Sequence, residues 1–257
     1  MRIELRFPIN ALTFLLGFNL VIFIIAFLLR SNLQFDAGSL YILGGFDLSK
    51  VYSGQLWLLV TSNFLHIELL HFLFNFYALY VIGREVMYIY EGKVLFATYI
   101  IGGLFGMLLP AYIPVILGGI STQAGVSSLI FFNFLGAGFF SLGASGAIFA
   151  LIGLLLTGAI RSNRKGGNFP ISPREILPVA IVSLIFGFIP GSNINNAAHL
   201  FGLLSGMILG YVFEPSLLNI KSRVSLLMEK VFYRLSLGIF ILSYIFLLIN
   251  AYNLILR

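Results

Sequence analysis

The longest uncharged stretch of the chain, from Val94 to Ile160, constrains its fold more than any other feature. A membrane-spanning helix needs about 20 apolar residues, so this stretch has room for two or three spans. Of all residues, 9% are charged and 60% are hydrophobic, and the mean hydropathy is +1.03. Soluble domains carry about 25% charged residues, which argues against an ordinary water-soluble fold. The sequence therefore predicts an all-α, polytopic membrane helix bundle.

Seven apolar segments are predicted to cross the membrane, two of them short enough to need untilted helices or a thinner bilayer. They cover residues 11–29, 64–82, 94–113, 143–160, 176–190, 197–213 and 231–255. The uncharged stretch is basic at both ends, which favours an even number of crossings within it. Residues 118–142 are then interpreted as an apolar loop that dips into the interface. A third crossing there is the alternative.

The segment before the last span has the pattern of an interfacial amphipathic helix. Residues 215–230 place Lys221, Arg223 and Lys230 among leucines. The expected division of the chain is a six-span core over residues 1–213, a cytoplasmic linker helix over 214–230 and a seventh transmembrane helix over 231–257.

The basic residues orient the bundle. With the N-terminus inside, 12 of the 15 Lys and Arg residues lie on the inner side, as is typical of cytoplasmic loops. They are Arg2, Arg6, Arg84, Lys93, Arg161, Arg164, Lys165, Arg174, Lys221, Arg223, Lys230 and Arg234. We expect a prokaryotic cell-membrane protein with a cytoplasmic N-terminus, an external C-terminus and no cleaved signal peptide. The net charge of +6 is explained by topology, so no nucleic-acid partner is predicted.

Polar residues from three separate spans fall at the same, outer depth. His66, His71 and Asn75 lie at the start of the second span, Ser145 starts the fourth, and His199 starts the sixth. Polar side chains inside a membrane are costly and tend to mark function. For His66, at the interface, a structural role is favoured. The other four residues together predict a site.

Small residues on two spans give these polar groups a reason to meet. Gly146 and Ala150 lie four residues apart on the fourth span. Gly202, Gly206 and Gly210 repeat at the same spacing on the sixth. Such stripes allow helix backbones to approach closely. Packing the two spans along them would bring Ser145 within reach of His199.

The residue types at this site indicate acyl-transfer chemistry. A histidine can take the proton of a serine hydroxyl and later return it to a leaving group. Spans four to six contain no Asp or Glu, so a dyad is predicted rather than a triad. Phe149, one turn after Ser145, is placed to pack on the His199 ring. His71, Asn75 and backbone N–H groups at the start of the fourth span could stabilise an oxyanion.

Other kinds of membrane site fit the sequence less well. His66 and His71 lack the spacing of an HExxH zinc motif, and no pair of membrane carboxylates is present. Cysteine is absent, so neither disulfides nor thiolate sites are expected. No metal or cofactor is predicted. A small-solute transporter would be expected to show more buried charge and an internal repeat.

At these residues the sequence resembles the rhomboid intramembrane serine proteases, over about residues 57–213. His66-Ile-Glu-Leu-Leu-His71-Phe-Leu-Phe-Asn75 resembles the family's HxxxxHxxxN signature. Gly143-Ala144-Ser145-Gly146 resembles its GxSG motif. Asn196-Ala-Ala-His199-Leu-Phe-Gly202-Leu-Leu-Ser-Gly206 resembles its AHxxGxxxG motif. The three motifs occur in order, which makes the resemblance specific.

The resemblance implies a six-helix core with one extra C-terminal helix, and roles for individual residues. Ser145 would be the nucleophile and His199 the base. His71 and Asn75 would line the oxyanion pocket, helped by the backbone at Gly143, Ala144 and Ser145. Supporting roles would fall to His66, Phe149, Gly146, Asn196, Gly202 and Gly206. The loop over residues 191–198 would cap the site, and span five would flank a lateral substrate entrance.

The implied partners are the lipid bilayer and single-pass transmembrane proteins, which would be cleaved in or near the membrane. Two positions depart from the family pattern: Trp57-Leu58 stands where Trp-Arg is frequent, and Phe149 replaces a ring-stacking tyrosine. The alternative function is a non-catalytic pseudoprotease that binds transmembrane helices. Such relatives usually lose the serine or the histidine, and this chain keeps both.

Overall fold

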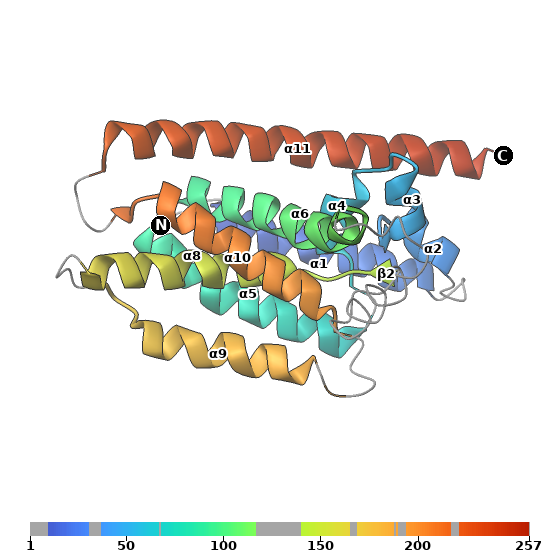
Figure 1. Ribbon diagram of the computed structural model, residues 1–257. Coiled ribbons are helices and arrows are strands. Elements are labelled where there is room, and N and C mark those ends of the chain that lie inside the picture. Colours follow the sequence, from blue (N-terminus) through green and yellow to red (C-terminus); the bar gives the residue numbers. More distant parts are fainter. Residues whose placement is uncertain are drawn as a thin grey trace, which may run out of the picture.

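The computed structural model describes residues 10–30, 37–66, 68–116, 140–164, 169–187, 189, 194–216 and 221–256. Nearly all of this part is helical, and the long helices run side by side in a bundle (Figure 1). Their bounds are α1 (Ala11–Arg30), α5 (Leu69–Ile89), α6 (Gly92–Ile116), α8 (Ser145–Arg164), α9 (Pro173–Phe186), α10 (Asn196–Val212) and α11 (Arg223–Ile255). The all-α bundle expected from the sequence is confirmed.

Short elements gather at one end of the bundle, between α1 and α5. They are α2 (Ala37–Ile42), β1 (Phe46–Asp47), α3 (Leu48–Tyr52), α4 (Leu58–Thr61) and the 3₁₀ turn η1 (Ser62–Phe64). β1 pairs antiparallel with β2 (Phe140–Ser141), with Phe46 opposite Ser141. Leu58 is fully buried in an apolar cluster with Tyr41, Phe46 and Val51. Apolar packing of Leu58 therefore holds the start of α4, at the position where the Trp-Arg pattern has its arginine.

Several helices are long and apolar enough to cross a membrane. Four pass by themselves: Ala11–Leu29, Gly92–Tyr112, Ser145–Asn163 and Arg223–Leu254. A fifth is a broken pair, Leu58–Phe64 and Leu69–Ile89, bent by 95°. α10 is a shorter apolar helix, in keeping with the sixth segment expected, whereas α9 has 14 residues and is not among these candidate spans. The chain is a multi-pass membrane protein, and the count of seven spans stays a prediction.

The structure differs from the expected second span at both ends. The helix was expected from residue 64, but Leu65 is extended and α5 begins only at Leu69. At the other end, α5 continues through Gly83, Arg84 and Glu85 to Ile89, because Gly83 packs against Leu12 of α1 instead of ending the helix.

The segment expected to form a separate linker helix is also different. Residues 223–230 belong to α11, which continues without interruption to Ile255. The helix begins at Arg223 and is capped by Ser222, whose side chain accepts the N–H of Ser225. Most of the proposed interfacial loop, residues 117–139, lies outside the described residues. The division of the chain at residues 213 and 230 remains a prediction.

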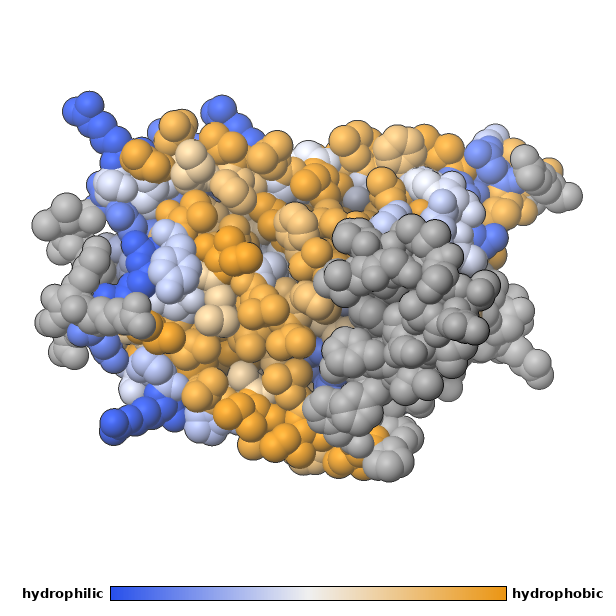
Figure 2. Space-filling model, in the orientation of Figure 1, coloured by the Kyte–Doolittle hydropathy of each residue, from blue (hydrophilic) through white to orange (hydrophobic). Residues whose placement is uncertain are grey.

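α8 forms the centre of the bundle and α11 its edge. In their most apolar windows, 83% of the α8 residues are buried, against 22% of the α11 residues. α8 packs on α10 and α6, while α9 and α11 lie on opposite sides of the bundle (Figure 1). On the face drawn in Figure 2, the coloured surface between the two ends is largely hydrophobic, as a surface in contact with lipid should be.

The two ends of the bundle differ in character. At one end, called here the basic end, α5, α8 and α10 finish and α6, α9 and α11 begin. Hydrophilic side chains gather there in Figure 2. The opposite end holds the β1–β2 pair and the first turns of α8 and α10. It is called the site end below.

Candidate active site

Ser145 is presented by a tight turn at the start of α8. Gly143 has a φ of +117°, a backbone conformation that favours glycine. Its N–H donates to the Ser62 carbonyl at 2.9 Å, which ties the turn to η1. α8 begins at Ser145, so the serine side chain lies at the N-terminal end of the helix.

His199 reaches Ser145 from the first turn of α10. Its Nε2 lies 2.7 Å from the Ser145 Oγ, a normal hydrogen-bond distance. The helix is capped by Asn195, whose side-chain oxygen accepts the Ala198 N–H at 2.9 Å. His199 is 6% exposed, so water has little access to its ring.

The close approach of α8 and α10 depends on the missing side chains of their glycines. A methyl group added at Gly202 would lie 2.2 Å from the Gly146 carbonyl oxygen. One added at Gly206 would lie 1.9 Å from the Ala150 carbonyl oxygen. The two backbones are therefore in direct contact, as the small-residue stripes predict. This contact sets the separation of Ser145 and His199.

Phe149 lies against the His199 ring. The ring centroids are 4.3 Å apart and the planes differ by 12°, so the rings are stacked. This contact is the one expected from the position of Phe149 one turn after Ser145. Phe149 thus stacks on His199 as the tyrosine of the family pattern would, but it has no hydroxyl group.

His66 and His71 flank the turn before Ser145. His66 is 1% exposed, and its Nε2 accepts the Ala144 N–H at 3.2 Å. A methyl group added at Gly143 would lie 2.8 Å from Cε1 of His71, so that ring rests on the turn. The two imidazole centroids are 5.2 Å apart. In this arrangement the Ala144 N–H is already engaged by His66.

The two asparagines of the sequence motifs occupy different places. Asn75 lines a small gap with His66 and Ala144, and its Nδ2 donates to the His71 carbonyl at 3.0 Å. Asn196 instead faces α9, where its Nδ2 donates to the Leu184 carbonyl at 3.1 Å. Asn75 thus lies beside the serine turn, and Asn196 joins α10 to α9.

Residues that the sequence analysis missed also hold the site together. Asn195 bonds through Nδ2 to the Ser141 Oγ at 3.1 Å, which connects the start of α10 to β2. Ser62 contributes only its carbonyl oxygen, to Gly143. An asparagine before an apolar helical segment is a recognisable N-cap signal, so Asn195 could have been found. A backbone acceptor such as the Ser62 carbonyl leaves no such signal.

This geometry agrees with the comparison to known families. The Rhomboid domain family model matches residues 53–216, which is more than half of the chain. The chain belongs to the rhomboid family. The matched region contains the helices α5, α6, α8, α9 and α10 and every residue of the candidate site.

Among similar rhomboid proteins, "Rhomboid protease GluP" of Bacillus subtilis is 32% identical over 163 residues, covering 63% of this chain and 27% of that protein. "RHOMBOID-like protein 5" of Arabidopsis thaliana is 28% identical over 66% of this chain and 48% of its own length. "Rhomboid protease GlpG" of Yersinia enterocolitica is 31% identical over 61% and 48%. The chain thus spans about half or less of the curated relatives it matches.

Proposed function

We propose that this rhomboid-family chain is an intramembrane serine protease that cleaves single-pass transmembrane proteins, with Ser145 as nucleophile and His199 as general base. The observation that carries the proposal is the 2.7 Å contact between the Ser145 Oγ and the His199 Nε2. Relatives named as rhomboid proteases support the same activity class.

In the proposed reaction, the Ser145 Oγ attacks the carbonyl carbon of the scissile peptide bond while its proton passes to the His199 Nε2. Collapse of the tetrahedral intermediate breaks the C–N bond, and His199 gives the proton to the departing amine. A water molecule then attacks the acyl-enzyme while His199 takes one of its protons. When this second intermediate collapses, the ester C–O bond breaks and His199 returns the proton to the Ser145 Oγ.

This sequence requires one particular form of the His199 ring. Because Nε2 must accept the serine proton, the ring N–H has to be on Nδ1. Nδ1 has no hydrogen-bond partner among the described residues. The stacked ring of Phe149 therefore stands in for an orienting carboxylate in the proposal.

The negative charge of the intermediate would form beside the start of α8. The Ser145 N–H, the His71 ring and the Asn75 amide are the donors assigned to it, since they border the turn at Gly143 and Ala144. The Asn75 amide would first have to leave the His71 carbonyl. The site is assigned to the outer leaflet, with the N-terminus in the cytoplasm.

The test is covalent labelling of the full chain in detergent with a fluorophosphonate probe, together with cleavage of a model transmembrane substrate. Both are expected for the unmodified chain and absent in Ser145→Ala and His199→Ala. Ser205→Ala is the matched control, because Ser205 is buried on α10 and its hydroxyl, among the described residues, donates to backbone carbonyls alone.

Equal cleavage by the unmodified chain and Ser145→Ala would rule out this assignment. Binding of the substrate without labelling or cleavage would support the alternative of a non-catalytic helix-binding relative.

A further inference from the structure

The last helix, α11, lies outside the region that matches the Rhomboid domain, yet it reaches the site end of the bundle. We infer that the site end of α11 is a positioning element for the dyad: Leu247, Phe246 and Asn250 brace the turn before β1, and β1 through β2 aligns Ser145 with His199. The inference rests on the proposed function.

Three residues of α11 contact the elements that precede the site. Phe246 stacks on Trp57, the residue before α4, with ring centroids 5.7 Å apart. The side-chain oxygen of Asn250 lies 3.2 Å from the hydroxyl of Tyr41, which also contacts the side-chain oxygen of Gln55. Leu247 is 7% exposed and faces Gly44, where an added methyl group would lie 3.1 Å from its Cδ2. α11 thus covers the turn between α2 and β1.

This turn is strongly bent and has little freedom once covered. Gly44 has a φ of +94°, and its carbonyl accepts the Thr61 hydroxyl at 2.7 Å. The Gly45 N–H donates to the Leu40 carbonyl at 2.8 Å. Leu247 closes the remaining side, so the turn is held between α4 and α11.

β1, the strand that follows the turn, is connected through β2 to the segments that carry Ser145 and His199. Phe46 pairs with Ser141, and α8 begins at Ser145, four residues further along the chain. The Ser141 Oγ accepts the side-chain N–H of Asn195, which caps α10 and precedes His199 by four residues. β2 is therefore joined to the start of α8 by the chain and to the start of α10 by a hydrogen bond.

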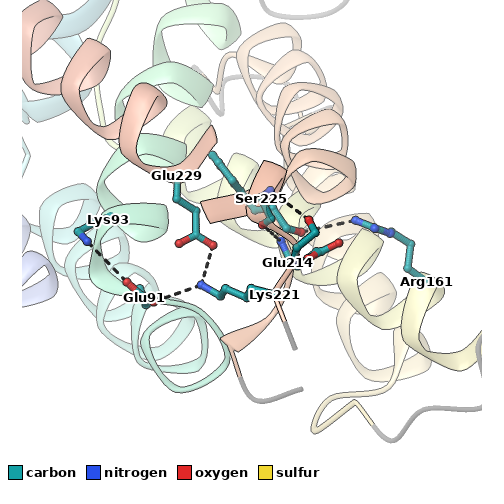
Figure 3. Close-up of polar contacts among 9 residues, drawn as sticks. Glu91, Lys93, Arg161, Glu214, Lys221, Ser225 and Glu229 are labelled. Carbon is teal, nitrogen blue, oxygen red and sulfur yellow. Dashed lines mark hydrogen bonds and ion pairs between the residues drawn. The ribbon is translucent and has the colours of Figure 1, made fainter. Parts of the chain in front are cut away.

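The other end of α11 is fixed independently, by charge. At the basic end the ammonium group of Lys221 lies 2.6 Å from Glu229 of α11 and 3.3 Å from Glu91 of the turn between α5 and α6 (Figure 3). Glu229 is 2% exposed. Between its ends, α11 packs through Phe240 and Tyr244 on Phe18 of α1 and Phe64 of η1. The ion pairs at the basic end are thus separate from the contacts that the site end of α11 makes with the turn before β1.

The experiment compares three substitutions in the full chain in detergent. Leu247→Ala removes the contact with the turn. Leu248→Ala is the matched control, because Leu248 is its neighbour, 68% exposed, on the outer surface of α11. Glu229→Gln loosens the basic end. The measurements are the maximal rate of fluorophosphonate labelling at Ser145, the probe concentration that gives half of it, and amide exchange over residues 140–146.

We expect Leu247→Ala to lower the maximal labelling rate about tenfold with the half-saturating concentration little changed, because misalignment weakens the reacting geometry rather than binding. Exchange over residues 140–146 should be faster. Leu248→Ala should match the unmodified chain in maximal labelling rate and in exchange. Glu229→Gln should lower the melting temperature without changing the labelling rate. Leu247→Met should recover most of the labelling rate.

Equal rates for Leu247→Ala and Leu248→Ala would overturn the inference. A slower labelling rate in Leu247→Ala with unchanged exchange over residues 140–146 would also overturn it. So would an equal loss of labelling rate in Glu229→Gln. If the unmodified chain is not labelled at Ser145, the proposed function fails. The exchange comparison still tests the brace in that case.

Discussion

Within the part of the chain that the structure describes, only Phe149 stacks on the His199 ring. Its loss should affect the proposed reaction more than the fold. An aromatic pair contributes about 0.5–1.5 kcal/mol beyond its buried area. We expect Phe149→Ala to lower kcat between about twofold and tenfold, since about 1.4 kcal/mol corresponds to tenfold. Phe149→Tyr keeps the ring and should retain most of the activity. A rate for Phe149→Ala equal to that of Phe149→Tyr would show that the stack does not orient His199.

His66 has a structural task that can be measured without any activity assay. It accepts the Ala144 N–H in a buried place, so His66→Ala leaves that donor unpaired. We expect a loss of about 1–3 kcal/mol in the free energy of unfolding in detergent. His66→Gln retains an acceptor and should lose less. Equal losses in both variants would mean that the hydrogen bond is not the cause.

At single positions, the sequence predicts which residues gather at the site but not which hydrogen bonds each of them makes. Ser145, His199 and Phe149 lie as expected because helix periodicity and small-residue stripes fix their relative depth. The partner of His66 could not be predicted, since it is a backbone N–H presented by a glycine turn. Asn196 differs for a similar reason: its acceptor is a carbonyl of α9, which no sequence pattern identifies.

Among the helices, the contact between α8 and α10 should tolerate almost no added volume. Gly206→Ala would force a methyl group against the Ala150 carbonyl, and such overpacking costs about 1–3 kcal/mol. Gly238→Ala is the control, because a methyl group added at Gly238 of α11 would meet no other part of the described structure within 4 Å. We expect Gly206→Ala to lower the melting temperature and the labelling rate, and Gly238→Ala to lower neither. Equal behaviour would place the helix contact elsewhere.

The existence of these helices follows from the sequence, whereas three helix ends do not. Apolar length predicts α1, α6 and α8 because a span needs about 20 such residues. The bend before α5 depends on the extended Leu65, and its late end depends on the packing of Gly83 against Leu12. The start of α11 depends on its capping serine. These are tertiary or local hydrogen-bond effects, which override hydropathy at helix ends.

For the whole molecule, the absence of cysteine makes the predicted orientation directly testable. Ser53 is exposed near the site end and Lys93 is exposed near the basic end. In intact cells, an impermeant maleimide should label Ser53→Cys, and Lys93→Cys only after permeabilisation. This is because basic ends face the cytoplasm. The reverse labelling pattern would invert the assignment of the active site to the outer leaflet.

The reach of α11 from the Lys221 ion pairs to the turn at Gly44 also bears on the order in which the molecule is completed. During synthesis, the segments that carry Ser145 and His199 leave the ribosome before Phe246, Leu247 and Asn250 exist. The contacts of α11 with the turn can form only once that last helix has entered the membrane. A nascent chain therefore holds its nucleophile and base before it holds the brace proposed to align them, so that proteolytic competence would be acquired only after α11 has been inserted.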